Sequence, residues 1–101
     1  MYEIVKSETF LKWLIRLKDQ KAKYKILARL KKIEEGYLGN YKRLDFKISE
    51  LKFDRGPGYR IYISIKINAI VILLCAGDKR SQKRDIIKAH KLIGEWEAQN
   101  E

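Results

Sequence analysis

Residues 51–76, LKFDRGPGYRIYISIKINAIVILLCA, decide the fold because they contain the clearest strand of the chain and its most apolar run. From 59 to 67, every second residue is tyrosine or isoleucine, which is the two-residue period of a β-strand. Residues 70–76 are apolar on both sides, as expected for a central strand that is covered on both faces. The composition of 55–58 predicts a turn, and Asn68 with Ala69 is expected to make a short reversal.

The segment before this region also alternates. Leu44, Phe46 and Ile48 follow a period of two, the phase slips at Ser49 and Glu50, and the alternation resumes afterwards. This pattern predicts one strand with a bulge or break, which together with the two strands that follow makes three antiparallel strands.

The N-terminal part predicts a short strand over residues 2–6 and then two helices. Ser7 and Asp19 are the expected N-caps, and Gly36 is the expected stop of the second helix. The apolar stripes of the two helices have helical spacing and are Phe10, Trp13, Leu14 and Leu17, then Ile26, Leu27, Leu30 and Ile33. Because almost nothing separates the helices, a helical hairpin is expected.

A last helix is predicted after Gly77, with Asp78 or Ser81 as its cap and with Ile86, Ala89, Ile93 and Trp96 as its buried stripe. The fold class is therefore α+β, in the order strand, helix, helix, three antiparallel strands, helix. We expect a single domain over residues 1–101 with one four-stranded sheet. We expect the helices at both ends of the sequence to cover one face of it, and Arg60 and Tyr62 to lie on the other, partly open face.

The composition restricts location and chemistry. The chain has no apolar run of 18 or more residues and no signal-peptide pattern, so a cytoplasmic protein without membrane contact is expected. The one cysteine, Cys75, lies in the apolar run and is expected to be a small core residue. No motif for a metal or nucleotide site or for a serine nucleophile is present, so no cofactor or metal is expected, and the one histidine, His90, is expected to pack on the last helix.

The charge points toward a polyanionic partner, because 23 Lys and Arg residues against 13 Asp and Glu residues give a net charge of +10. Positive side chains suit the cleavage of RNA by its own 2′-hydroxyl, since the substrate supplies the nucleophile and arginines stabilise the phosphorane. The candidates are Lys52 and Arg60, brought together across a hairpin, with Lys79 and Arg80 at the end of the neighbouring strand. A solvated basic face without chemistry is the alternative.

The segments LKFDRGPGYRIYI (51–63) and GDKRSQKRDIIKAHKL (77–92) resemble the RelE/ParE superfamily of toxins, in particular its HigB-like addiction module killer branch. The resemblance begins at FLKWL (10–14) and extends into the last helix. It implies a RelE-like fold and the toxin of a type II toxin–antitoxin system, a free monomer that a cognate helix-turn-helix antitoxin binds. RelE-like members are mRNA interferases, metal-independent endoribonucleases that cut ribosome-bound mRNA, whereas ParE-like members inhibit DNA gyrase.

The resemblance also implies roles for individual residues. Arg60 and Arg80 match arginines that act on the scissile phosphate, and Lys52 matches a candidate base. The expected RNA-binding residues are Lys66, Lys79, Gln82, Lys83 and Arg84.

Two positions depart from the RelE pattern, because Glu50 stands where a companion lysine is found and Ile86 stands where a tyrosine is found. Lys79 or Lys83 would then have to be the general acid. These departures keep a third hypothesis open, a degenerate module that binds its antitoxin without cutting RNA. Asp78 and Asp85 are expected to organise the turn between strand and helix.

Overall fold

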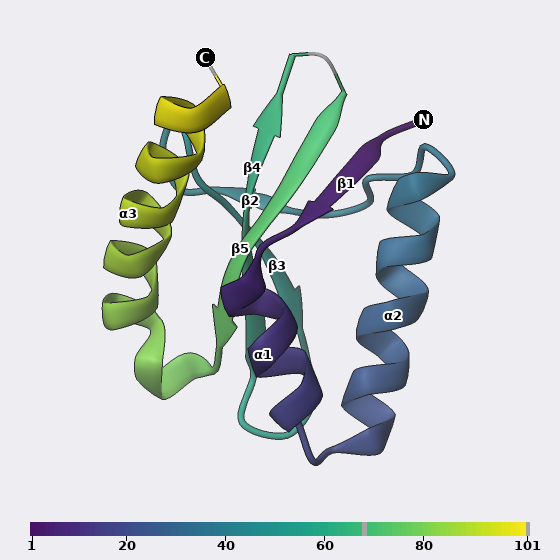
Figure 1. Ribbon diagram of the computed structural model, residues 1–101. Coiled ribbons are helices and arrows are strands. Elements are labelled where there is room, and N and C mark those ends of the chain that lie inside the picture. Colours follow the sequence, from purple (N-terminus) through teal and green to yellow (C-terminus); the bar gives the residue numbers. More distant parts are fainter. Residues whose placement is uncertain (68, 101) are drawn as a thin grey trace.

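Five strands form one sheet in the order β1-β5-β4-β3-β2 in a computed structural model that describes residues 1–67 and 69–100 (Figure 1). Their bounds are β1 Glu3–Lys6, β2 Lys42–Arg43, β3 Ser49–Phe53, β4 Tyr59–Lys66 and β5 Ile70–Gly77. The strands β3, β4 and β5 are antiparallel, as predicted, and β1 lies parallel to β5.

The prediction of four strands was wrong because β2 was missed. It consists of two exposed basic residues that pair with Ser49 and Glu50, so it has no apolar alternation that could reveal it. The alternation over residues 44–48 belongs to a turn instead. The side chain of Asp45 accepts hydrogen bonds from the backbone N–H groups of Lys47 and Ile48, both at 2.8 Å, which bends the chain there.

The helices are α1 Glu8–Arg16, α2 Gln20–Glu34 and α3 Gln82–Asn100, and a 3₁₀ turn, η1 Lys79–Ser81, precedes α3. Both predicted caps are confirmed: Ser7 accepts from Phe10 N–H at 3.0 Å, and Asp19 accepts from Ala22 N–H at 3.0 Å. The Ser7 hydroxyl also donates to the carbonyl of Leu74 at 2.7 Å, which fastens the start of α1 to β5. Of the helices that the structure describes, none is long and apolar enough to cross a membrane.

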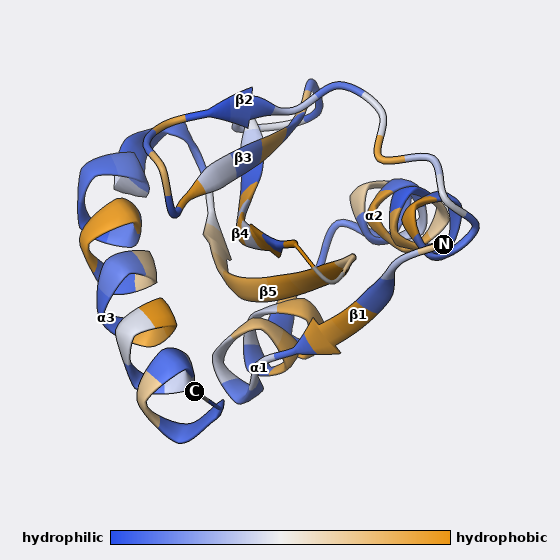
Figure 2. Cartoon of the chain, turned by 90° about the horizontal axis from the view of Figure 1, so that it is seen from above, coloured by the Kyte–Doolittle hydropathy of each residue, from blue (hydrophilic) through white to orange (hydrophobic). Residues whose placement is uncertain are grey.

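Helices cover both faces of the sheet, so the prediction that they all cover one face was wrong (Figure 2). One core lies under α1 and α2 and includes Phe10, Ile26, Leu30, Ile33, Ile61, Ile63 and Leu73. The other lies under α3 and includes Ile48, Tyr62, Ile72, Leu74, Ala89 and Ile93. Since β4 and β5 present apolar side chains to both sides, each face requires a cover. Arg60 and Tyr62 are therefore buried on the α3 face and not on an open one.

A bulge in β5 changes the direction of its side chains. Tyr62 pairs with Cys75 and Ile63 pairs with Leu73, so Leu74 is an extra residue without a partner on β4. As a result Leu74 and Cys75 both face α3, and Cys75 is a core residue, as predicted. In the reversal before β5, Ala69 is in the left-handed region with φ at 59°, while the other predicted turn residue, Asn68, lies outside the described residues.

Candidate functional site

Arg60 is held inside the protein by a carboxylate. It lies on β4 directly opposite Lys52 of β3, as predicted. Its side chain is 8% exposed, its Nε donates to Glu50 Oε1 at 3.1 Å, and its Nη1 donates to the carbonyl of Gly58 at 2.9 Å. The Glu50 side chain is 4% exposed, so the two form a buried ion pair. The second carboxylate oxygen of Glu50 accepts from Gln82 of α3 at 3.4 Å.

Other predicted residues gather around the same turn. The backbone N–H of Lys79 donates to the carbonyl of Pro57 at 3.4 Å. A side chain added at Gly58 would begin 3.4 Å from Arg60 Nη1 and 3.7 Å from Lys79 Cβ, so these two basic residues flank Gly58. Lys52 is 57% exposed and lies 4.0 Å from Asp54. Lys52, Arg60, Lys79 and Gln82 therefore surround one end of the β3–β4 hairpin, and we call them the hairpin cluster.

Tyr62 lies below this cluster. Its hydroxyl is buried and finds no hydrogen-bond partner within residues 1–67 and 69–100. Burial raises the pKa of Tyr62, and the negative charges of Glu50 and Asp85 raise this pKa further. The phenol therefore remains neutral, on the residue that pairs directly with Glu50 across the β3–β4 ladder.

The junction after β5 is organised by the two aspartates, as predicted. Asp78 accepts from the backbone N–H groups of Arg80 at 2.8 Å and of Ser81 at 3.3 Å, and the Ser81 hydroxyl accepts from Asp78 N–H, which completes a capping box. The hydrogen bond from the Arg80 side chain, followed by those from the backbone, lowers the pKa of Asp78. Asp85 accepts from the Ser81 hydroxyl at 2.5 Å, and its Oδ2 lies 1.9 Å from where a side chain at Gly77 would begin.

Arg80, Lys83 and Arg84 are placed apart from the hairpin cluster. They line a groove together with Trp13 and Tyr59. Arg80 is 85% exposed and pairs with Asp78 at 3.1 Å.

Lys66 is at the opposite end of β4 from Arg60, about 20 Å away for six residues of strand. It contacts Glu97 and lies over the ring of Trp96, 5.7 Å from the centroid. The expected RNA-binding residues therefore do not form a single patch.

His90 lies beside the buried stripe of α3 and joins the helix to another segment. Its side chain is 45% exposed, and its Nε2 lies 2.7 Å from Asp45 Oδ2, so it connects α3 to the turn at 44–48. The buried stripe of α3 passes through Ala89 and Ile93, which leaves position 90 on the edge of the helix.

Sequence reasoning also missed Lys12, Arg16 and Lys88, which line a second part of the groove. A signal was available, because Lys12 with Arg16 and Arg84 with Lys88 are spaced by four residues, so each pair lies on one side of its helix.

Comparisons with known proteins support the fold. No family model matches the chain. In the solved structures, the chain is similar to a mutant of the E. coli toxin RelE in the free state, with a TM-score of 0.67 and 20% identity over 89% of this chain and 95% of that one. It is also similar to a chain of the intact E. coli RelBE toxin-antitoxin complex, with a TM-score of 0.61 and 20% identity over 77% of this chain and 96% of that one.

A relative by sequence is an uncharacterized protein of Haemophilus influenzae. It is 43% identical over 93 residues, which cover 92% of this chain and 94% of the relative. The structural matches establish the RelE fold that the sequence resemblance implied. The chain thus has the fold of RelE and belongs to the same protein family as the Haemophilus influenzae protein.

Proposed function

We propose that the chain is the toxin of a type II toxin–antitoxin system, of the HigB-like branch, and that it cleaves ribosome-bound mRNA without a metal. The observation that carries this proposal is the hairpin cluster, which unites Lys52, Arg60 and Lys79 at one end of a sheet with the RelE fold. A net charge of +10 favours a nucleic-acid substrate.

The reaction requires two proton transfers and charge stabilisation. The 2′-oxygen of the substrate attacks the adjacent phosphorus, the bond from phosphorus to the 5′-oxygen breaks, and a 2′,3′-cyclic phosphate and a 5′-hydroxyl result. We assign Lys52 as the base that removes the 2′-proton and Lys79, which flanks Gly58 beside Arg60, as the acid that protonates the 5′-oxygen. Arg60 would stabilise the phosphorane. Arg80 is 85% exposed, pairs with Asp78 and lines the groove apart from the hairpin cluster, so we assign it no part in this step.

The Glu50–Arg60 ion pair favours a second candidate function. A phosphate that approaches Arg60 also approaches the Glu50 carboxylate, which repels it. A chain in which this arginine remains bound to Glu50 would keep the toxin fold and bind an antitoxin without cutting RNA. The two candidates differ in whether the substrate can displace Glu50 from the guanidinium.

The partner in both cases would be a cognate antitoxin of the helix-turn-helix class. A structural neighbour is described as an intact toxin–antitoxin complex, which supports a protein partner for this fold. We expect a free monomer that acts in the cytoplasm and is inactive when the antitoxin is bound.

The test is to induce the chain in a bacterial host, with and without the antitoxin gene, and to map mRNA ends. Growth arrest with sharp cuts inside translated codons is expected, and Lys52→Ala should abolish the cuts, because Lys52 is exposed and its loss leaves the core intact. Lys21→Ala on the exposed side of α2 is the matched control and should cut like the original chain. Intact mRNA with inhibited gyrase supercoiling would establish the ParE-like alternative. If neither mRNA cleavage nor gyrase inhibition occurs, the result supports the module that binds an antitoxin without cutting RNA.

A further inference from the structure

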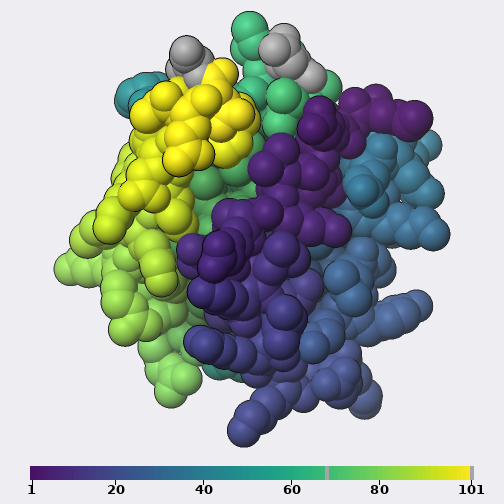
Figure 3. Space-filling view, in the orientation of Figure 1, coloured from purple at the N-terminus to yellow at the C-terminus, as the bar shows by residue number. Residues whose placement is uncertain are grey.

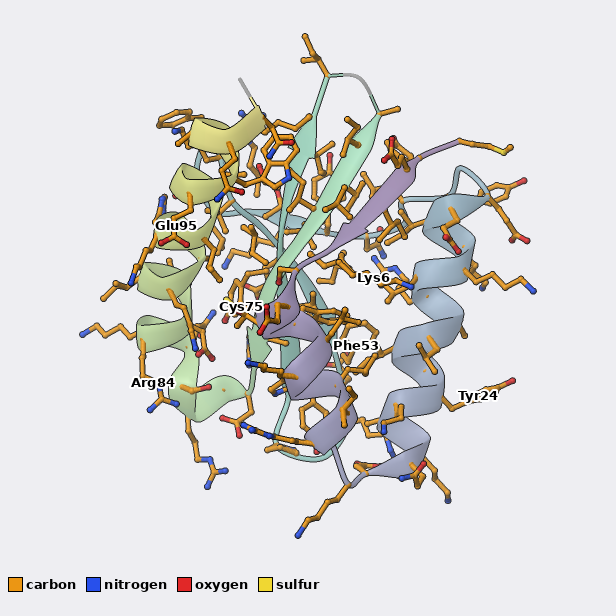
Figure 4. All side chains as sticks on the ribbon, in the orientation of Figure 1. Lys6, Tyr24, Phe53, Cys75, Arg84 and Glu95 are labelled. Atoms are coloured by element: carbon orange, nitrogen blue, oxygen red, sulfur yellow. The ribbon has the colours of Figure 1, made fainter. Side chains whose placement is uncertain are left out.

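A basic groove runs between α1 and the first turns of α3. It consists of two adjoining hollows of about 610 Å³ and 410 Å³, which share Trp13, Ala76 and Asp85. In Figure 3, α1 in purple and α3 in yellow-green lie side by side on the face of the molecule, and Figure 4 labels Cys75 between the two helices. Residues Cys75 and Ala76 of β5 lie between the two helices and form the floor.

The charge of the groove is strongly positive. Basic side chains come from both walls: Lys12 and Arg16 from α1, and Arg80, Lys83, Arg84 and Lys88 from η1 and α3. The carboxylates in the groove, those of Asp78 and Asp85, are already bound by the junction itself. Two of the cations are themselves paired, Arg80 with Asp78 at 3.1 Å and Lys12 with the exposed Glu8 at 2.8 Å. Six basic side chains against the carboxylates of Glu8, Asp78 and Asp85 still leave the groove with an excess of positive charge.

The groove also offers aromatic surface between the cations. Trp13 is half-buried and lines both hollows. Its ring meets Tyr59 edge-on, with centroids 5.9 Å apart and planes at 74°, which holds the indole in a fixed orientation. Cations that follow a backbone, together with an aromatic face for a base, are the combination that single-stranded nucleic-acid sites use.

This groove is separate from the hairpin cluster. On one flank of α3, Gln82 reaches Glu50 beside Arg60. On the other flank, Arg84, Asp85 and Lys88 line the groove against α1. The N-terminal turns of α3 thus stand between two basic surfaces.

We propose that the groove between α1 and α3 is a second RNA-binding surface, which holds a single-stranded segment with its phosphates on the two rows of cations and a base against Trp13. Its preference for a polyanion follows from its own residues, whereas the choice of RNA rests on the proposed function. Lys12, Arg16 and Lys88 thereby become binding residues that have no part in the proposed chemistry.

The test measures binding and not cleavage. A short fluorescent 2′-O-methyl RNA strand lacks the attacking hydroxyl, so it is not cut, and its anisotropy gives the dissociation constant at several salt concentrations. The variant Lys12→Gln/Arg16→Gln removes two cations from the groove. For single strands each lost phosphate contact lowers the salt slope by about 0.7, so the slope should fall by about 1.4 and binding should weaken roughly tenfold at physiological salt.

Lys21→Gln/Lys25→Gln is the matched control, because it removes the same charge with the same spacing from exposed positions of α2. It should leave the salt slope nearly unchanged. Equal weakening by both double variants would show a diffuse charge effect and overturn the proposal, as would tighter binding of an acidic peptide than of RNA.

The outcome is independent of the proposed function. If induced cells show no RNA cleavage but the groove variant still binds RNA more weakly than its control, the nuclease proposal fails and the groove proposal stands. If cleavage occurs but the groove variant binds RNA as the original chain does, the groove proposal fails alone.

Discussion

Replacing Arg60 by alanine should destabilise the folded protein, in addition to any effect that it has on RNA cleavage. The guanidinium and the Glu50 carboxylate are almost completely withdrawn from water, with side chains 8% and 4% exposed. Removing one partner of a buried ion pair leaves the other charge uncompensated, which costs about 3–5 kcal/mol. A domain of this size has a total stability of roughly 5–15 kcal/mol, so Arg60→Ala should be marginally folded.

A double-mutant cycle measures the pair directly. We expect Arg60→Ala and Glu50→Ala each to lower the free energy of unfolding by about 3–5 kcal/mol. The double variant should lose less than the sum by about 1–3 kcal/mol, because no buried charge remains without its partner. Glu50→Gln should cost less than Glu50→Ala, since an acceptor for Arg60 Nε is kept.

The assay is urea unfolding followed by circular dichroism. Glu8 and Lys12 provide the control pair, because their side chains are 81% and 62% exposed, and Glu8→Ala should be indistinguishable from the original chain. Additive losses below 1 kcal/mol for Arg60→Ala and Glu50→Ala would refute the buried pair. The same experiment decides how a loss of toxicity in Arg60→Ala is to be interpreted.

Three further predictions concern other parts of the fold. Gly77→Ala should lower the free energy of unfolding by about 1–3 kcal/mol in thermal or urea melts, because the added carbon would meet the Asp85 carboxylate. The control Gly94→Ala adds a carbon with nothing within 4 Å, so it should be neutral or stabilising by up to about 1 kcal/mol. Equal changes in stability for the two variants would contradict the description of the junction. Burial raises the pKa of Cys75 to about 12, so iodoacetamide at pH 8 should label it only in urea, and rapid labelling of the native protein would contradict its place in the core. Hydrogen bonds from two lysines lower the pKa of Glu97 from 4.5. The contribution of Glu97 to stability should therefore be complete above pH 4.5 and should disappear as the pH falls through the lowered pKa. When stability is measured across acid pH, the difference between the original chain and Glu97→Gln should shrink over that range.

Local signals in the sequence predicted much of the fold. Ser7 and Asp19 were recognisable as caps because a short oxygen-bearing side chain precedes each apolar stripe. The turn between β3 and β4 fixed the pairing of Lys52 with Arg60, because the glycine-rich segment between the strands has a defined length. The two-sided apolar character of β5 correctly predicted a strand inside the sheet that is covered on both faces.

The missed features depend on contacts between distant segments. The strand β2 is basic and exposed, and it forms only because the turn at Asp45 returns the chain alongside β3. The face that α3 covers is decided by the junction after Gly77, which no periodicity describes. The partner of Arg60 was accessible in principle, because the register that pairs Lys52 with Arg60 places Glu50 diagonally across the same face.

The bulge in β5 limits which changes in length the chain can tolerate. Because Leu74 has no partner on β4, deleting one residue there would restore a regular ladder with Ile63 and Tyr62. Cys75 and the later residues would keep their partners on β4 and their sides of the sheet, because Leu74 and Cys75 face α3 together and the deletion removes one of the two. The deletion would instead remove the Leu74 side chain, which is buried under α3, and the Leu74 carbonyl that accepts the Ser7 hydroxyl and fastens α1 to β5. We therefore expect insertions and deletions to be accepted in the loop before β2 and excluded from β5, although a shorter β5 would form the more regular sheet.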